Sequence, residues 1–508
     1  MRASGRSGCT MQFNSVNFMI FFPIVVLLYF IIPKKCRMYW LLIASYYFYM
    51  SWNAKYALLI GASTLITYAC GLIIAHVSTQ NNARAKKKAA LIVCLGINLS
   101  ILGLFKYGNF GIESLNWLLK RMNLSPITRR FDFLLPVGIS FYTFQALGYT
   151  IDVYRGDVDA EKNIARYALF VSFFPQLVAG PIERSKNLLG QMRHIEDIKL
   201  WNARRIASGA ILMIWGLFMK MVIADRVSLL VDHVFDNHRM YGSSELIVAL
   251  LGFSLQIYCD FGSYSLIAKG AARIMGFDLM DNFIAPYFAT SIRDFWSRWH
   301  ISLSSWFRDY LYIPLGGNRK GVIRKAINTM IVFLVSGLWH GASWTFVIWG
   351  GIHGLYQVAG DITSPLRKKL AKDFNIKTDC FSWRLLQRAV TVALVAFAWV
   401  FFRADTMADA LRYIQRIFTR PTPWLFFNGG LYDLGLNQTE TNILLVSTAL
   451  LLLVDHIRVN KGMAIDRFLF SQNIWFEWLV IIGLILMIVT FGKYGPTYDA
   501  RQFIYFQF

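Results

Sequence analysis

The chain has 508 residues, of which 56% are hydrophobic and 16% aromatic, and its formal net charge is +23 at pH 7. This composition is too apolar for an ordinary soluble globular protein. The positive charge does not indicate nucleic-acid binding, because lysine and arginine gather in short loops between apolar runs and no nucleic-acid-binding motif accompanies them. We therefore predict an all-α, polytopic integral protein of the cell membrane, with membrane lipid as a partner and no nucleic acid.

Apolar runs recur along nearly the whole chain. A membrane-spanning helix needs about 20 apolar residues, and several runs are shorter, so we expect some tilted, broken or re-entrant helices. We predict roughly ten to twelve transmembrane or re-entrant helices. The runs are Val16–Pro33, Met38–Trp52, Tyr56–Val77, Ala89–Phe105, Ala165–Pro181, Ile206–Ala224, Leu246–Cys259, Met330–Trp349, Ala389–Phe402, Asn442–Val454 and Ile474–Gly492.

Basic clusters in the short loops predict the orientation of the chain. Cytoplasmic loops of membrane proteins carry an excess of lysine and arginine, so we expect these clusters on the cytoplasmic side. The six cysteines are scattered without metal-ligand spacing, and we expect no metal site. The basic clusters are Lys34–Arg37, Arg84–Lys88, Arg319–Lys325 and Arg367–Lys369.

Asp260 directly follows the apolar run Leu246–Cys259. An ionisable side chain at membrane depth is costly and is a functional-site hypothesis by default. We therefore predict that Asp260 is a candidate for lining a substrate site.

A helix over Arg293–Arg308 would carry a narrow polar stripe. At 100° per residue its members fall within an arc of roughly 80°, and aromatic and aliphatic side chains fill most of the rest. Such a stripe is typical of a helix that borders a polar cavity, although an interfacial helix anchored by tryptophans would show the same pattern. The cavity interpretation makes His300 a catalytic candidate and the other members substrate-lining candidates, whereas Ser302 would lie about 160° from His300. The stripe consists of Arg293, Ser297, His300, Ser304 and Arg308.

His340 is the only ionisable residue in the apolar run Met330–Trp349. At 1.5 Å per residue this run is about long enough to span a hydrocarbon core of roughly 30 Å, which places His340 near mid-membrane. We therefore predict that His340 is catalytic. The alternative is helix packing, since Gly337 and Gly341 form a GxxxG pair that lets a neighbouring helix come close.

His353 follows thirteen residues after His340. A continuous helix would place the two histidines on different faces, and Gly350 and Gly351 are expected to interrupt the helix. A metal-ligand pair from these histidines is therefore not expected, and we predict a structural role for His353.

Several segments together resemble the membrane-bound O-acyltransferase family, in particular its alginate O-acetyltransferase branch. They span most of residues 11–508, so the resemblance does not depend on a short motif. The segments are WSRWHISLSSWFRDYLYIPLGGNR from Trp296, GLWHGASWTFVIWGGIHG from Gly337, LPVGISFYTFQALGYTIDVYRGD from Leu135, FFPQLVAGPIER from Phe173, YCDFGSYSLIAKGAARIMGF from Tyr258, VFFRADTMADA from Val400 and the closing FIYFQF.

The resemblance implies a single domain over residues 11–508 in which helices surround a central funnel that reaches His340. Residues 1–10 do not fit the family's start, and we expect a disordered tail or a misassigned start there. His340 would be the general base, taking a proton from a hydroxyl that attacks a thioester carbonyl. No cofactor would be bound, and the donor substrate would be acetyl-CoA or another cytoplasmic acyl thioester.

The implied acceptor is an extracytoplasmic hydroxyl on a cell-wall or secreted polysaccharide. Family members often work with an extracytoplasmic SGNH-hydrolase-like transferase, which is therefore an expected partner. Leu266 stands where the acetyl branch usually has aspartate, and leucine there resembles the teichoic-acid D-alanyl branch, so D-alanyl transfer stays an alternative. A transporter or flippase is a further alternative, disfavoured because no inverted repeat is visible.

Overall fold

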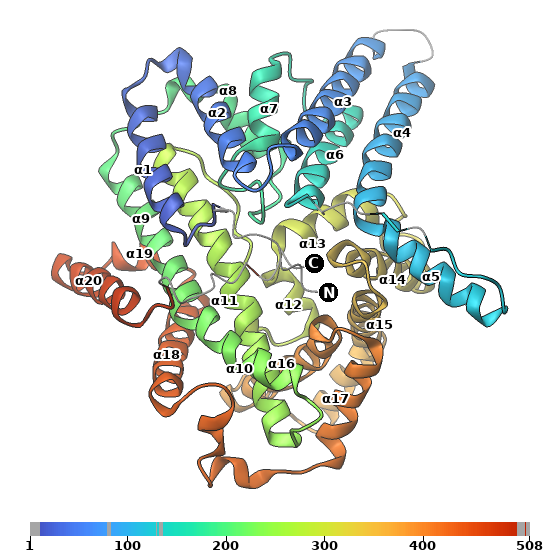
Figure 1. The fold of residues 1–508 in the computed structure, drawn as a ribbon, viewed down its shortest axis with the longest axis vertical. Helices are drawn as coiled ribbons and strands as arrows, with labels where there is room; N and C mark the ends of the chain where they lie inside the picture. The colour runs from blue at the N-terminus through green and yellow to red at the C-terminus, as the bar shows by residue number, and fades with distance from the viewer. Residues whose placement is uncertain (1–10, 79–82, 129, 132–135, 495–502, 504–508) are drawn as a thin grey trace. The chain divides into compact units, whose positions relative to one another are not determined.

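The computed structural model describes all residues except 1–10, 79–82, 129, 132–135, 495–502 and 504–508 (Figure 1). The described residues form helices joined by turns, with no strand among them. They divide into two compact units, Met1–Ala210 with Ile267–Met280 and Ile211–Leu266 with Asp281–Phe508. The all-α prediction is confirmed, and the single domain over residues 11–508 stays a prediction. The tail predicted at residues 1–10 lies outside the described residues.

The first unit is built largely from apolar helices of the N-terminal part of the chain. Two long helices, α9 and α11, pass from one unit into the other. The helices are α1 (Val16–Ile31), α2 (Arg37–Met50), α3 (Tyr56–Val77), α4 (Ala83–Leu102), α5 (Gly108–Arg121), α6 (Ile139–Arg155), α7 (Ile164–Ser172), α8 (Gly190–Arg193), α9 (Ala203–Phe218) and α11 (Ser243–Met275).

The apolar run predicted as a span over Ala165–Pro181 is only partly helical. Helix α7 ends at Ser172, and the residues after it are buried but not helical. Proline and glycine disfavour a helix there, and a buried irregular backbone is tolerated where protein groups satisfy it. The backbone N–H of Phe174 donates to Ser45 Oγ at 3.1 Å, and Gln145 Nε2 donates to the Phe170 carbonyl at 2.6 Å. This run is therefore a broken helical segment, of the kind expected for the shorter apolar runs.

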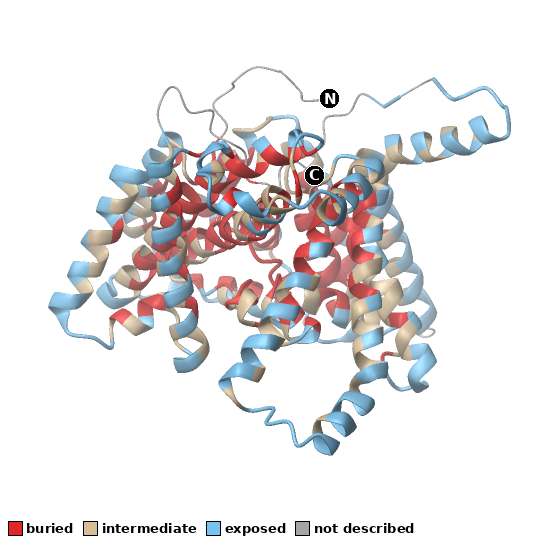
Figure 2. Ribbon diagram, turned by 90° about the horizontal axis from the view of Figure 1, so that it is seen from below, coloured by how far each residue is buried: buried red, intermediate tan, exposed pale blue. Residues whose placement is uncertain are grey.

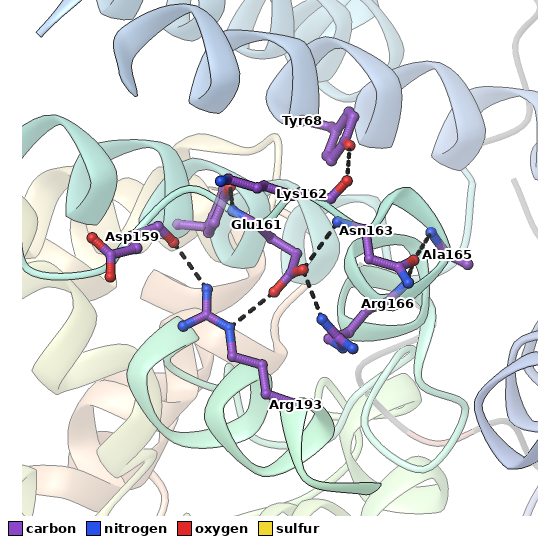
Figure 3. A network of polar contacts seen from close by, with 9 residues as sticks. Tyr68, Asp159, Glu161, Lys162, Asn163, Ala165, Arg166 and Arg193 are labelled. Carbon is purple, nitrogen blue, oxygen red and sulfur yellow. Dashed lines mark hydrogen bonds and ion pairs between the residues drawn. The ribbon is translucent and has the colours of Figure 1, made fainter. Parts of the chain in front are cut away.

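The connection between α6 and α7 is organised by the buried carboxylate of Glu161 (Figure 3). Glu161 accepts hydrogen bonds from Arg193 Nε at 2.9 Å, Arg166 Nη1 at 2.9 Å and the backbone N–H of Asn163 at 3.0 Å. Burial raises the pKa of this carboxyl group, but these partners outweigh burial and hold the pKa below its ordinary value. The Asn163 side chain in turn caps the start of α7.

Replacing Glu161 with glutamine is expected to lower the free energy of unfolding by about 1–3 kcal/mol at pH 7, because charge-assisted hydrogen bonds are lost. The folded-state pKa lies below the unfolded value, so the carboxylate stabilises the fold above about pH 4.3 and loses this effect as the pH falls through the folded pKa. Thermal unfolding in detergent should therefore show a difference between wild type and variant that shrinks in acid. Glu113→Gln, at an exposed pair with Arg130, is the control and should change little.

The second unit contains the remaining helices and all of the residues discussed below as a candidate site. Four π-helical segments occur in the described part of the chain, and two of them lie in this unit, Met219–Ala224 between α9 and α10 and Arg308–Tyr312 after α13. The helices are α10 (Asp225–Asp236), α12 (Ile292–Arg298), α13 (Ile301–Phe307), α14 (Gly321–His340), α15 (Trp344–Asp373), α16 (Phe381–Arg403), α17 (Met407–Thr419), α18 (Gln438–Lys461), α19 (Ile465–Leu469) and α20 (Ile474–Phe491).

Eight helical stretches in the described part of the chain are long and apolar enough to cross a membrane. Many helices carry buried residues on one side and exposed residues on the other, and the exposed residues include many large apolar side chains (Figure 2). Lipid is the solvent that makes such an apolar exterior stable, so the predicted multi-pass membrane protein is confirmed. The stretches are Tyr56–Val77, Ala83–Arg121, Ala203–Asp236, Ser243–Met275, Gly321–His340, Phe381–Arg403, Gln438–Lys461 and Ile474–Phe491.

Candidate active site

Helices α14 and α15 lie next to each other (Figure 1), and the three residues between them make them an antiparallel hairpin. A Cβ atom at Gly337 would lie 2.3 Å from the Phe346 carbonyl oxygen, and one at Gly350 would lie 2.2 Å from the Phe333 carbonyl oxygen. Only glycine allows the two backbones this approach. The predicted single span over Met330–Trp349 is therefore wrong, because the chain turns back inside this run.

Glycine and serine make the turn of the hairpin. Helix α14 ends at His340, Gly341 is extended with φ −157°, and Ser343 caps α15 by accepting a hydrogen bond from the Thr345 N–H. The predicted helix break at Gly350 and Gly351 is also wrong, since α15 runs through both. His340 thus stands at the end of a helix, at the tip of the hairpin.

His340 is 4% exposed and is enclosed by aromatic rings. Its ring centroid lies 5.0 Å from Trp339, 5.0 Å from Trp349 and 5.6 Å from Phe402. The ring of His300 is 6.1 Å away, so the structure brings the two predicted catalytic histidines together. The two interpretations of this segment are therefore compatible. The glycines allow α14 and α15 to pack closely, and His340 at the end of α14 lies among aromatic rings.

His300 lies between two short helices and not on a continuous one. Helix α12 ends at Arg298, α13 begins at Ile301, and His300 has the left-handed backbone φ 44°, ψ 52°. A non-glycine residue in this region is uncommon and is often found at functional sites. The predicted continuous helix over residues 293–308 is therefore wrong. His300 is fully buried, and burial lowers its pKa to about 3, so the imidazole is neutral at physiological pH.

The other members of the predicted stripe do not share the surroundings of His300. Exposed Arg293 forms an ion pair with Asp361, and exposed Arg308 pairs with its neighbour Asp309 at 2.8 Å. Both arginine side chains are exposed, whereas His300 is buried.

The two serines of the stripe form local hydrogen bonds. Ser297 Oγ donates to the Asp294 carbonyl at 2.6 Å, and Ser304 Oγ donates to the Trp299 carbonyl at 3.4 Å. Contact of these four stripe residues with substrate stays a prediction.

Asn282 is the residue of this site that the sequence reasoning missed. Its side-chain oxygen Oδ1 lies 3.1 Å from His300 Nδ1, 2.9 Å from Ser302 Oγ and 3.3 Å from Ser302 N. Its Nδ2 donates to Ser265 Oγ at 3.2 Å, and its backbone carbonyl accepts from the Ile301 N–H at 3.0 Å. Ser302, predicted to lie away from His300, therefore belongs to the same network. Asparagine is ordinary in the turns between helices, so nothing in the sequence singled this one out.

Asp260 is buried in an ion-pair cluster on α11. Lys220 Nζ lies 2.5 Å from Asp260 Oδ1 and 2.9 Å from Asp225 Oδ1. The next residue, Phe261, packs edge-on against His300 with centroids 4.7 Å apart. Asp260 is thus a buried charged residue, as predicted, and Lys220 is its cationic partner. Contact of Asp260 with substrate stays a prediction.

A model of the membrane-bound O-acyltransferase family matches residues 160–402, which include Asp260, His300 and His340. A probable alginate O-acetylase of Pseudomonas putida is 38% identical over 414 residues, covering 80% of this chain and 80% of the relative. The chain belongs to the membrane-bound O-acyltransferase family. A peptidoglycan O-acetyltransferase of Helicobacter pylori is 35% identical over 79% of each chain. A teichoic acid D-alanyltransferase of Bacillus subtilis is 26% identical over 46% of this chain and 60% of its own.

His353 belongs to the aromatic packing of this O-acyltransferase. Its Nδ1 accepts a hydrogen bond from Trp296 Nε1 at 3.2 Å, and its ring packs against Trp349 at 5.1 Å. An indole N–H can only donate, so Nδ1 carries the lone pair of the neutral ring. The structural role of His353 stays a prediction, and these contacts support it.

The arrangement suits acid–base chemistry in an enclosed, apolar site. Two buried imidazoles lie close together, and a neutral imidazole can take a proton from a hydroxyl or return one to a leaving group. Aromatic walls around an active site exclude water, which limits competing hydrolysis. Among the described residues, no group of three or more histidine, cysteine or acidic side chains is placed to hold a metal ion.

Proposed function

We propose that this O-acyltransferase moves an acetyl group from acetyl-CoA on the cytoplasmic side to a hydroxyl of an extracytoplasmic cell-wall or secreted polysaccharide. The observation that carries the proposal is the pair of enclosed histidines, His300 and His340, within a chain whose O-acetylating relatives align over about four-fifths of it. D-alanyl transfer is the second candidate, supported by Leu266 and by the shorter match to a teichoic acid D-alanyltransferase.

The proposed reaction is a direct acyl transfer. His340 takes the proton of the acceptor hydroxyl while the hydroxyl oxygen attacks the thioester carbonyl carbon. The carbon–sulfur bond then breaks, and the proton passes from His340 to the departing thiolate, which leaves as a thiol. An ester and free coenzyme A are the products. The overall reaction needs no cofactor, oxidant or reductant.

A separate protein would present the polymer. The connections between the described helices are too short to form a folded domain that could hold a polysaccharide chain, and the longest, between α17 and α18, has 18 residues. An extracytoplasmic SGNH-hydrolase-like transferase is the partner we propose for this step.

The test is transfer by the purified protein in lipid. Acetyl-CoA labelled in the acetyl group should yield a labelled ester on a polysaccharide acceptor or on the partner, with release of free thiol. Labelled D-alanyl thioester is the competing donor. Ester formed from the D-alanyl donor alone would replace the acetyl proposal, and no ester from either donor would reject acyl transfer.

The orientation of the α14–α15 hairpin supports access from the cytoplasm. Because the helices are antiparallel, the basic start of α14 and the Arg367–Lys369 cluster in α15 lie at the same end. Helix α14 is long and apolar enough to cross a membrane. The hairpin would therefore enter from the cytoplasmic side and carry His340 into the membrane before returning.

Cysteine labelling on a cysteine-free background tests this orientation. We expect single cysteines at Lys87 and Val322 to be protected from an impermeant thiol reagent added to intact cells, and to react after lysis. Phe427, 88% exposed in the connection between α16 and α18, should react from outside and is the positive control. Labelling of position 87 or 322 in intact cells would reverse the topology and remove the cytoplasmic donor with it.

A further inference from the structure

The amide of Asn282 is oriented by its neighbours. The backbone N–H of Ser302 is an obligate donor, so the atom of Asn282 that faces it at 3.3 Å must be the oxygen. Ser302 Oγ donates to the same oxygen at 2.9 Å, and the amide nitrogen lies on the other side, 3.2 Å from Ser265 Oγ. The side chains of Asn282 and Ser302 are both buried, so water does not compete for these hydrogen bonds.

The orientation of the amide determines the tautomer of His300. An amide oxygen only accepts hydrogen bonds, so the nitrogen of His300 that lies 3.1 Å from it must carry the hydrogen. That nitrogen is Nδ1, and in a neutral imidazole the lone pair is then on Nε2. Among the described residues, the rings of Phe261, Phe283, Trp339 and His340 pack against His300, and His340 contributes a second imidazole.

Asn282 also holds the backbone that carries His300. Its carbonyl accepts from the Ile301 N–H at 3.0 Å, and two residues further on the Ile284 N–H donates to the Arg298 carbonyl at 3.0 Å. These bonds lie on either side of the left-handed residue His300. Contacts of this kind are what stabilises a backbone conformation that costs of order 1–3 kcal/mol by itself.

We propose that Asn282 is a positioning residue for acyl transfer, which holds His300 as the Nδ1–H tautomer so that Nε2 faces the reaction as a proton acceptor. The proposal rests on the proposed function, because His300 acts beside His340 in that reaction. In it, Nε2 of His300 accepts a hydrogen bond from the acceptor hydroxyl or from protonated His340, and the opposite tautomer would present a donor instead.

Kinetics of three variants test the positioning role. Asn282→Ala should lower kcat at least about 10-fold, because His300 loses both its orientation and its tautomer preference. Asn282→Asp keeps an oxygen for Nδ1–H and for Ser302, so it should restore much of the activity at high pH. Its negative charge favours the imidazolium form of His300, which should move the acid limb of the pH–rate profile upward by about 1–3 pH units.

Asn328→Ala is the matched control for loss of a buried asparagine. Asn328 lies on α14, is fully buried in the same unit, and donates from Nδ2 to the Gly317 carbonyl at 2.9 Å. Asn328→Ala should lower the free energy of unfolding and leave the pH–rate profile of acyl transfer unchanged. Wild-type kcat in Asn282→Ala, or equal losses in the alanine and aspartate variants with an unshifted profile, would reduce Asn282 to a structural role.

Nitrogen NMR tests the tautomer without any turnover. In protein labelled with ¹⁵N-histidine, the resonances of His300 are those lost in His300→Gln. Nδ1 should resonate as a protonated nitrogen and Nε2 as an unprotonated one, and Asn282→Ala should abolish this preference. A protonated Nε2 in the wild type overturns the proposal even if acetyl transfer is observed, whereas absence of acetyl transfer with the expected spectrum rejects only the proposed function.

Discussion

Replacing His340 with alanine is expected to lower the rate of acyl transfer by about 100- to 10,000-fold or more while leaving a folded membrane protein. The variant removes the imidazole that we propose takes the hydroxyl proton. The remaining enclosure of Trp339, Trp349 and Phe402 keeps most of the packing around the site. Initial rates of ester formation, normalised to the folded protein recovered, measure the effect.

A glutamine at position 340 separates catalysis from packing. Glutamine is similar in length and polar, so a purely structural histidine between α14 and α15 should be largely replaced by it. It cannot accept a proton near neutral pH, so a general base should not be replaced. His456→Ala, at an exposed histidine on α18, is the control and should retain the wild-type rate. Near-wild-type transfer by His340→Gln would assign His340 to packing.

The sequence predicted the class of fold because the apolar content of the chain leaves few alternatives. A helix is the only open-chain structure that satisfies its own backbone in lipid, so long apolar runs had to be helical. The same patterns could not locate turns inside a run. Met330–Trp349 was interpreted as one span because no ionisable residue other than His340 interrupts it, although Ser343 is a recognisable N-cap residue.

The candidate site was predicted unevenly for a related reason. His340 was identified by the cost of an ionisable residue in an apolar run, which is a property of the sequence itself. His300 was identified from a helical stripe that does not exist, because no proline or glycine marks the break between α12 and α13. Contacts with Asn282, eighteen residues earlier, hold that break. Such tertiary contacts override local propensity, and one sequence alone does not reveal them.

Replacing Gly350 with alanine is expected to be among the most damaging single changes in the chain, although it adds only one methyl group. The new Cβ would lie 2.2 Å from the carbonyl oxygen of Phe333 and 3.2 Å from the Cα of Gly337, and these backbone atoms cannot rotate away. The two helices must then separate, at a cost of about 1–3 kcal/mol or more in stability. Because His340 stands at the tip of this hairpin, a shift of about 1 Å could also lower transfer by about 100-fold.

Gly351→Ala is the matched control for Gly350→Ala. It makes the same chemical change at the next position of α15, where the added Cβ would meet only Leu334 Cδ2 at an ordinary 3.5 Å. Alanine also favours a helix over glycine by about 1 kcal/mol, so this variant should be as stable as wild type or more so. Unfolding midpoints in detergent and rates of ester formation are measured for both variants. If Gly350→Ala were as stable and active as Gly351→Ala, the close approach of α14 and α15 would not be what holds His340 in place.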